Sequence, residues 1–409
     1  MHPGYSKTLV YTCILLLLSL HGCTQTSDVL VNHHPEAIGF DEDKRLEVRG
    51  ALQKAIESGK IAGATLLISD NKGDGILELL GSQGPDDKTP VDENTLFRIY
   101  SMTKPIVSVA TMILVEQGKL SLSDPVSDYL PEYVNLKVLD EQTGETRPAN
   151  SVMTIENLLT HESGLIYGVF DSESPLGKIY LENGSRSSDI TARELAAKLG
   201  KLPLRFDPGT QWHYGRSTDV LGAVLEVVSG QTLDVLLERI LFKPLTMSDT
   251  FFYVPEDKGA RLAEAVYGQL SLPKQPGAML SAGGGLVSST RDYAQFGLML
   301  INKGRYKGEQ IISEETLQRM ISPYIGQDVG RQYFFYKDKG DFGLGFGLVP
   351  INSESPQSDL TYGWGGYAGT EFWVDPANGF FVVYMIQAHS VPGGLVFHPR
   401  RAIYQSLSN

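Results

Sequence analysis

The sequence predicts a mixed α/β fold of the α+β kind, in which both ends of the chain build one antiparallel sheet flanked by helices. Two observations predict it. Strand-like apolar runs bounded by turn residues occur near the start of the chain and again near its end, and the stretch between them is divided by prolines into short, mostly helical segments. We therefore expect a sheet region at about residues 41–100 and 290–409, with a mainly helical region inserted at about residues 101–289.

Composition and charge are those of a globular protein. Of the 409 residues, 42% are hydrophobic and 20% are charged, which is enough apolar material for one large core or two interlocked ones. The formal net charge is −13 at pH 7. Because an acidic surface repels a phosphate backbone, this charge argues against nucleic acid as a partner.

The first 22 residues have the pattern of a secretion signal, with an apolar run from Leu9 to Leu20 that is too short for a confident membrane span. The tetrapeptide Leu20-His21-Gly22-Cys23 is similar to a bacterial lipoprotein cleavage site, where the cysteine becomes the lipidated first residue. We expect a periplasmic protein of the bacterial cell envelope, lipid-anchored at Cys23; plain secretion or an uncleaved anchor are the alternatives. Residues 23–40 are expected to be a tether, and residues 41–409 the folded domain.

The first expected elements are a helix and a hairpin. Residues 41–60 place apolar side chains among charges, with acids toward the start, which predicts an amphipathic helix. Residues 62–69 and 76–80 are apolar runs separated by the turn-forming residues 71–75, and this pattern predicts a β-hairpin.

Three further helices are expected in the middle of the chain. Residues 154–165 begin with an N-cap threonine and stop near a glycine, and residues 218–229 and 291–301 carry apolar side chains at helical spacing. The last of them follows Gly283-Gly284-Gly285, which lacks the lysine and hydroxyl residue of a phosphate-binding loop. A tight backbone turn is the better interpretation of that glycine run.

The end of the chain returns to strands. Strands are expected at residues 346–350, 362–364, 370–374 and 380–387. Residues 375–379 are expected to form the hairpin turn between the last two strands, and residues 396–407 a closing helix.

The stretch of most chemical interest is Ser101-Met102-Thr103-Lys104-Pro105. A serine with a lysine three places on also occurs at Ser69 and Ser271, but turn formers and prolines assign both of those to loops. After Ser101, apolar residues between 106 and 114 recur at helical spacing. Proline lacks a backbone N–H and is tolerated only near the first turn of a helix, so Ser101 is expected at the positive end of the helix dipole.

Ser101 and Lys104 suit nucleophilic catalysis. A spacing of three places both side chains on one face of the helix. The free backbone N–H of Ser101 can help hold a developing oxyanion. In an apolar setting the charged form of Lys104 is expected to be disfavoured, so that the lysine accepts or relays the serine proton.

Five motifs occur in an order typical of one superfamily. They are the Ser-x-x-Lys helix start at Ser101, Leu-Leu-Thr-His-Glu-Ser-Gly-Leu at residues 158–165, Tyr214 ahead of Ser-Thr-Asp-Val-Leu-Gly, the glycine run with Leu-Val-Ser-Ser-Thr, and Trp364-Gly365-Gly366. On these residues the chain, from about residue 40 to its end, resembles the serine β-lactamase and penicillin-binding protein superfamily, most of all class C β-lactamases and family VIII carboxylesterases. The resemblance implies a β-lactamase-like fold.

The resemblance also implies roles for individual residues. It makes Ser101 the acylated nucleophile, Lys104 its proton partner, and Tyr214 the general base that later activates water. A phenol has a pKa of about 10, and this pKa must be lowered before the group can act as a base. A neighbouring ammonium would lower it. The oxyanion hole of the family would use the N–H groups of Ser101 and of Tyr367, which follows Trp364-Gly365-Gly366 on an expected edge strand.

Two departures from the superfamily pattern concern the substrate. β-Lactamases and D-Ala-D-Ala peptidases have Lys-Thr/Ser-Gly where this chain has Trp364-Gly365-Gly366, and their lysine binds a substrate carboxylate. Trp364 offers an apolar face suited to a neutral ester or acyl chain, and family VIII esterases commonly carry Trp-Gly-Gly here. The usual Tyr-x-Asn is Tyr214-Gly215-Arg216, so Arg216 is a candidate to replace the lost cation and bind substrate; a structural or surface arginine is the alternative.

We therefore expect a serine hydrolase that works through an acyl-serine intermediate, as a carboxylesterase on short-chain or small esters. The alternatives are a β-lactamase or D-Ala-D-Ala peptidase, and a catalytically silent protein that binds cell-wall fragments. A zinc protease is not expected, because His161-Glu162 lacks the second histidine of a zinc protease helix, and no cofactor is expected, because no cofactor motif occurs. The expected partners are a small ester or acyl substrate and, through Cys23, the membrane.

Overall fold

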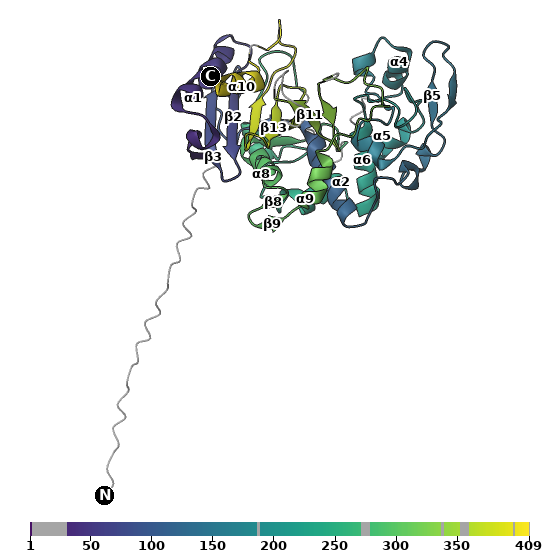
Figure 1. Ribbon diagram of the computed structural model, residues 1–409, viewed down its shortest axis with the longest axis horizontal. Helices are drawn as coiled ribbons and strands as arrows, with labels where there is room; N and C mark the ends of the chain where they lie inside the picture. The colour runs from purple at the N-terminus through teal and green to yellow at the C-terminus, as the bar shows by residue number, and fades with distance from the viewer. Residues whose placement is uncertain are drawn as a thin grey trace.

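The chain folds into a sheet region and a mainly helical region that lie side by side (Figure 1). The computed structural model describes Met1 and residues 31–185, 189–270, 279–336, 339–351, 360–395 and 397–408. The expected signal and Cys23 lie outside the described residues. In Figure 1 the helical region is marked by α4 (Pro175–Glu182), α5 (Ala192–Leu199) and α6 (Ser217–Ser229).

Within the described residues, eight strands form the main sheet, in the order β1-β3-β2-β14-β13-β12-β11-β10. Strands from the two ends of the chain meet where β2 pairs antiparallel with β14, and every neighbouring pair except β1 and β3 is antiparallel. The predicted antiparallel sheet built from both chain ends is therefore confirmed. Its strands are β1 (Asn32–His33), β2 (Gly63–Asp70), β3 (Asp74–Gly81), β10 (Asp341–Phe342), β11 (Gly347–Pro350), β12 (Leu360–Gly365), β13 (Glu371–Asp375) and β14 (Phe380–Ile386).

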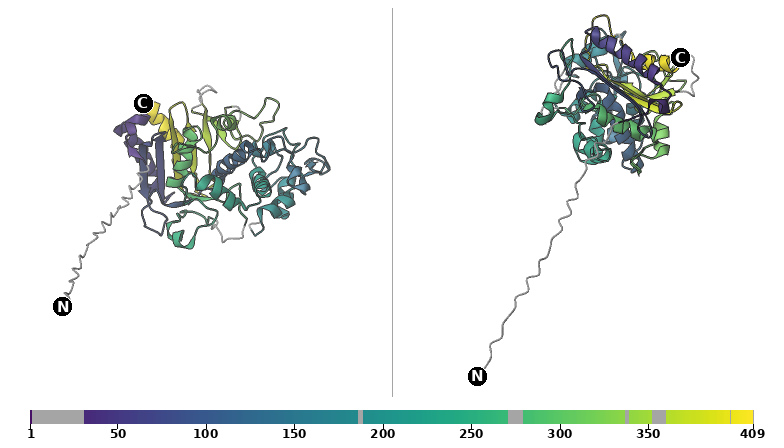
Figure 2. Two further views of the ribbon diagram at one scale, coloured as in Figure 1. Left: turned by 90° about the horizontal axis from the view of Figure 1, so that it is seen from below. Right: turned by 90° about the vertical axis from the view of Figure 1, so that its left-hand side faces the viewer.

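Helices cover both faces of this sheet (Figure 2). The helices α1 (Glu42–Glu57) and α10 (Pro399–Ser408) pack together over one face, and α8 (Thr290–Ile301) packs against the other. Because successive side chains of a strand point to opposite faces, β13 contributes Phe372 to the core beneath α8 and Trp373 to the core beneath α1.

Apart from the 14-residue helix α2 (Thr103–Glu116), the remaining elements are short. They are β4 (Leu96–Arg98), η2 (Tyr100–Met102), η3 (Val126–Asp128), η4 (Pro131–Tyr133), β5 (Lys137–Leu139), β6 (Thr146–Pro148), α3 (Ile155–Leu159), η5 (Val169–Asp171), α7 (Leu233–Leu237), the π-helix η6 (Glu238–Phe242), η7 (Glu256–Arg261), β7 (Val287–Ser289), β8 (Arg305–Tyr306), β9 (Glu309–Gln310) and α9 (Glu314–Met320). The middle of the chain thus holds 3₁₀ turns and a small β5–β6 sheet among its helices.

Two local expectations from the sequence need correction. The helix expected at 154–165 is much shorter: Thr154 caps it as predicted, but α3 ends at Leu159 because His161 takes a left-handed conformation with φ of 61°. Ser69 lies in strand β2, not in a loop. Ser271 lies outside the described residues.

Residues 31–40 belong to the domain, which corrects the expected tether. Val31, Ile38 and Phe40 are buried, and β1 pairs with β3. Burial of these three apolar side chains away from water stabilises the segment against the domain. The expectation of a linker through residue 40 is wrong for this stretch.

Among the described residues, no single helix is long and apolar enough to cross a bilayer, and one pair, α6 with Leu233–Phe242, meets the length and composition requirement only across a 76° bend.

Two helical glycines provide a matched test of core packing. A Cβ atom on Gly297 of α8 would lie 2.4 Å from the ring of Phe381 on β14, whereas a Cβ on Gly50 of α1 would meet nothing within 4 Å. We expect Gly297→Ala to lower the free energy of unfolding by ~1–3 kcal/mol, because the core must shift. Gly50→Ala should raise it by ~0.5–1 kcal/mol. Urea unfolding measures both, and equal effects would contradict this packing.

Candidate active site

Ser101 lies in the 3₁₀ turn η2, which runs directly into α2. Pro105 is the third residue of α2, so the start of the helix lies where the proline predicted it. The preceding Tyr100 has a φ of 43°, a left-handed conformation that costs ~1–3 kcal/mol in a residue other than glycine. The turn is held from both sides, because the Ile99 N–H donates to a carbonyl ahead of β7 and the Met102 carbonyl accepts from the Tyr293 hydroxyl.

The structure brings together the three residues that the sequence singled out for catalysis. The Tyr214 oxygen lies 2.6 Å from Oγ of Ser101, and Nζ of Lys104 lies 3.3 Å from the same Oγ. Nζ also lies 4.6 Å from the centre of the Tyr214 ring. Lys104 is buried, while Ser101 and Tyr214 are half-buried. A hydroxyl, a phenol and an amine therefore meet at a point that a small molecule can reach.

Lys104 is held as an ammonium. Its Nζ donates to the Gly283 carbonyl at 2.6 Å and to the Tyr167 hydroxyl at 2.9 Å. Burial lowers the pKa of Lys104, but the phenol oxygens of Tyr167 and Tyr214 raise it by more, so the net pKa lies above its ordinary value. The expectation that the charged form is disfavoured is wrong, because the apolar pattern of the helix does not show the oxygens that surround this amine.

Tyr167 is a site residue that the sequence pattern did not indicate. Its hydroxyl accepts from Lys104, and its ring lies 5.4 Å from the ring of Tyr214. Burial raises the pKa of Tyr167 above its ordinary value, although the Lys104 charge opposes this, so the group is a neutral phenol. The residue comes shortly after Gly164 in the chain, but no periodicity or spacing rule marks it as functional.

The glycine run forms the turn that holds Lys104. The Gly283 N–H donates to Oδ1 of Asp219 at 3.0 Å, and the Ser281 hydroxyl donates to the same oxygen at 2.7 Å. A Cβ on Gly283 would lie 2.9 Å from that carboxylate, so only glycine fits without a shift. Burial raises the pKa of Asp219, but Arg216, the Ser281 hydroxyl and the Lys104 charge together lower it by more, which keeps the carboxylate charged.

Arg216 is directed at protein groups. Its guanidinium pairs with Asp219 at 2.9 Å, donates to the Ser185 carbonyl and lies over the Tyr167 ring at 4.8 Å. These contacts fit the structural alternative for Arg216, and they do not support its interpretation as a replacement cation for a substrate carboxylate.

Trp364-Gly365-Gly366 forms one wall of the site. The Trp364 ring lies 5.5 Å from the Tyr214 ring, with Nε1 3.4 Å from the Tyr214 oxygen. A Cβ on Gly366 would lie 2.5 Å from the Ile99 carbonyl, so the absence of a side chain lets the end of β12 approach the chain beside Ser101. The oxyanion role of the Tyr367 N–H stays a prediction.

The expectation that Trp364-Gly365-Gly366 belongs to an edge strand is wrong for most of β12, because β12 lies between β11 and β13. Its last two residues, Trp364 and Gly365, extend past the pairing with β11 and remain paired with β13 alone. At this end, beside Ser101, the strand has a free edge on which a substrate could lie.

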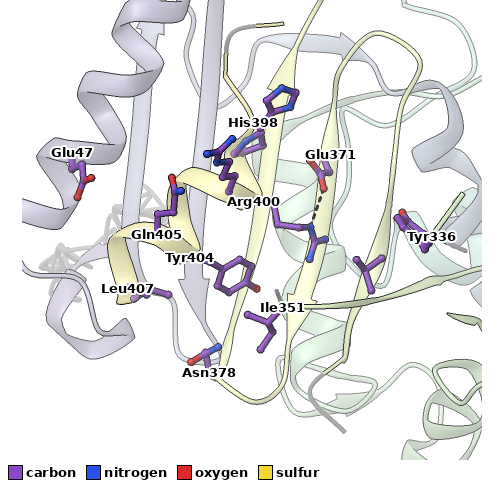
Figure 3. A pocket seen from close by; sticks show the side chains of 13 residues that line it. Glu47, Tyr336, Ile351, Glu371, Asn378, His398, Arg400, Tyr404, Gln405 and Leu407 are labelled. Atoms are coloured by element: carbon purple, nitrogen blue, oxygen red, sulfur yellow. Dashed lines mark hydrogen bonds and ion pairs between the residues drawn. The ribbon is translucent and has the colours of Figure 1, made fainter. Parts of the chain in front are cut away.

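A large groove lies away from these residues (Figure 3). A groove of about 1060 Å³ on the α10 side of the sheet is lined by Ile351, Glu371, Arg400 and Tyr404, among others, and by none of Ser101, Lys104 and Tyr214. Glu371 and Arg400 pair with each other across it. Side-chain chemistry, and not cavity size, therefore locates the candidate active site.

Comparison with known proteins decides the family. Residues 48–403 match the family model described as Beta-lactamase. The chain belongs to the beta-lactamase family. Protein Rv1367c of Mycobacterium tuberculosis is 31% identical over 363 residues, covering 83% of this chain and 89% of that protein. Esterase EstB of Burkholderia gladioli is 28% identical over 393 residues, covering 86% and 93%.

A solved structure supports the same assignment. EstCE1, described as a hydrolase with promiscuous acyltransferase activity, is 26% identical with a TM-score of 0.74, covering 89% of this chain and 99% of that one. Members of the beta-lactamase family are serine hydrolases that include esterases and peptidases. The fold and the broad class of enzyme predicted from the sequence are thereby confirmed.

Tyr167→Phe tests whether the phenol beside Lys104 contributes to the reactivity of Ser101. We expect labelling of Ser101 by a fluorophosphonate to slow by ~10- to 100-fold, the equivalent of one hydrogen bond to a charged group. Tyr324→Phe is the matched control, because its hydroxyl meets Arg319 and none of the residues around Lys104. A wild-type labelling rate in Tyr167→Phe would contradict the role given to this phenol.

Proposed function

We propose that this protein is a carboxylesterase that cleaves small neutral esters through an acyl-serine intermediate on Ser101. The observation that carries the proposal is the position of Trp364 in the site wall, against the Tyr214 ring. A carboxylate-binding lysine at this position would favour penicillins or peptidyl-D-alanine as substrates. An indole face removes water from an apolar group and offers nothing to a carboxylate. The esterases among its relatives support the same substrate class.

In the proposed acylation, Tyr214 reacts as the phenolate, after its own proton has left to solvent. Oγ of Ser101 attacks the ester carbonyl carbon while the serine proton passes to the Tyr214 oxygen, 2.6 Å away. The Lys104 ammonium stays charged and compensates the negative charge that moves between these two oxygens. The C–O bond to the alcohol then breaks, and Tyr214 returns the proton to the leaving oxygen.

In the proposed deacylation, Tyr214 takes a proton from water, whose oxygen attacks the acyl carbon. The bond to Oγ breaks, the proton returns to Ser101, and the carboxylic acid leaves. The N–H groups of Ser101 and Tyr367 are the proposed oxyanion donors in both steps, and the close approach at Gly366 supports this placement.

Ester turnover tests the function. The wild type should hydrolyse p-nitrophenyl acetate and butyrate, and Ser101→Ala should be slower by at least ~10³-fold because it lacks the nucleophile. Ser123→Ala, which alters an exposed serine, should keep the wild-type rate. Equal rates of ester hydrolysis for Ser101→Ala and the wild type would refute the proposal. Faster turnover of nitrocefin than of either ester would instead assign a β-lactamase.

We also propose that the protein is a lipoprotein of the bacterial cell envelope, anchored at Cys23, because of the leader pattern ahead of that residue. The chain has two cysteines, and Cys13 lies inside the leader, which makes Cys13→Ser the matched control. Expressed in a bacterium fed labelled palmitate, the wild type and Cys13→Ser should carry label, and Cys23→Ser should carry none. Label retained by Cys23→Ser would disprove the anchor.

A further inference from the structure

We propose that Phe170 and Phe335 form an apolar clamp at the mouth of the site, which selects esters that carry an aromatic group over esters with short aliphatic chains. This inference rests on the proposed esterase function and narrows its substrate class. It also departs from the short-chain esters expected from the sequence, because a short chain would leave both rings in water.

The exposure of these two rings is the first observation. Of the 16 phenylalanines, all of which lie in the described residues, Phe170 and Phe335 are the two with exposed side chains, at 61% and 58%. Most phenylalanines of a globular protein are buried, since each ring removed from water is stabilising. Exposed apolar surface that gathers at one place marks a binding site.

The position of the rings is the second observation. The Phe170 ring lies 6.5 Å from the Tyr214 ring, inclined by 29°, and the Phe335 ring lies 5.4 Å from it. Phe335 also lies 6.1 Å from Trp364, inclined by 30°. Both exposed phenylalanines therefore contact the phenol that lies against Ser101. An aromatic group of a bound ester would meet the faces and edges of these rings, in the geometries that aromatic pairs prefer.

The two rings come from different parts of the fold. Phe170 lies in η5 of the helical region, and Phe335 lies in the connection between α9 and β10, at the sheet region. The ring centres of Tyr167 and Phe170 lie 5.5 Å apart, and those of Trp212 and Phe335 lie 5.3 Å apart. The clamp thus spans the boundary between the two regions, where the reactive groups lie.

Each ring is carried on a segment that an arginine holds in place. Arg205, whose side chain is buried, pairs at 2.7 Å with Asp171, the residue next to Phe170. Near Phe335, Arg331 pairs with Asp341 at 2.7 Å and donates to the Gly340 and Ile325 carbonyls. A ring on an anchored segment loses little freedom when a ligand binds, so the two rings are preorganised for binding.

The test compares three esters that differ in one aromatic group: ethyl propanoate, ethyl 3-phenylpropanoate and benzyl propanoate. The wild type is expected to prefer at least one aromatic ester by kcat/KM, and Phe170→Ala and Phe335→Ala should each reduce that preference by ~10-fold. Loss confined to one aromatic ester assigns the clamp to the acyl or the alcohol part. Val134→Ala, which removes exposed apolar surface at the end of η4, should keep the wild-type preference.

Two outcomes separate this inference from the proposed function. Turnover of all three esters with a preference that neither alanine variant changes would overturn the clamp and leave the esterase intact. Turnover of none would reject the esterase, and the clamp is then tested by binding of ethyl 3-phenylpropanoate to Ser101→Ala in calorimetry. There, adding Phe170→Ala should weaken binding by ~10-fold, and unchanged binding would overturn the clamp. Circular dichroism and thermal unfolding of each variant verify that it folds.

Discussion

The buried ammonium of Lys104 is the interaction on which the rest of the site depends. A charge taken out of water is unstable unless it is paired with hydrogen-bond acceptors. Here the Ser101 Oγ, the Tyr167 hydroxyl and the Gly283 carbonyl accept from it, and the Tyr214 ring lies beneath it. Each of these groups therefore contacts the same charge, which lies beside both oxygens of the proposed proton transfer.

The scaffold brings these partners together from distant parts of the chain. The glycine turn reaches Lys104 because Asp219, on α6 and paired with Arg216, accepts from the Gly283 N–H and the Ser281 hydroxyl. The end of β12 reaches the nucleophile turn because Gly366 has no side chain. Pairing of strands from the two chain ends leaves the helical region beside the sheet, so Ser101, Lys104 and Tyr214 lie where the two regions meet.

Features that depend on neighbouring residues could be predicted from the sequence, whereas features that depend on contacts between distant residues could not. Pro105 located the start of the nucleophile helix, and turn formers located the β2–β3 hairpin, because both effects act within a few residues. The charge state of Lys104 could not be predicted, since it depends on tyrosines that the apolar helix pattern does not show. Tyr167 was missed for the same reason. His161 ended α3 early by taking a left-handed conformation that no helix propensity describes.

Mass spectrometry of the enzyme quenched in acid during turnover can detect the acyl-serine intermediate. With p-nitrophenyl butyrate, we expect a mass increase of one butyryl group, carried by the peptide that contains Ser101, and its disappearance once the ester is consumed. Turnover of the ester with no added mass, or with the acyl group on another residue, would exclude Ser101 as the acylated nucleophile.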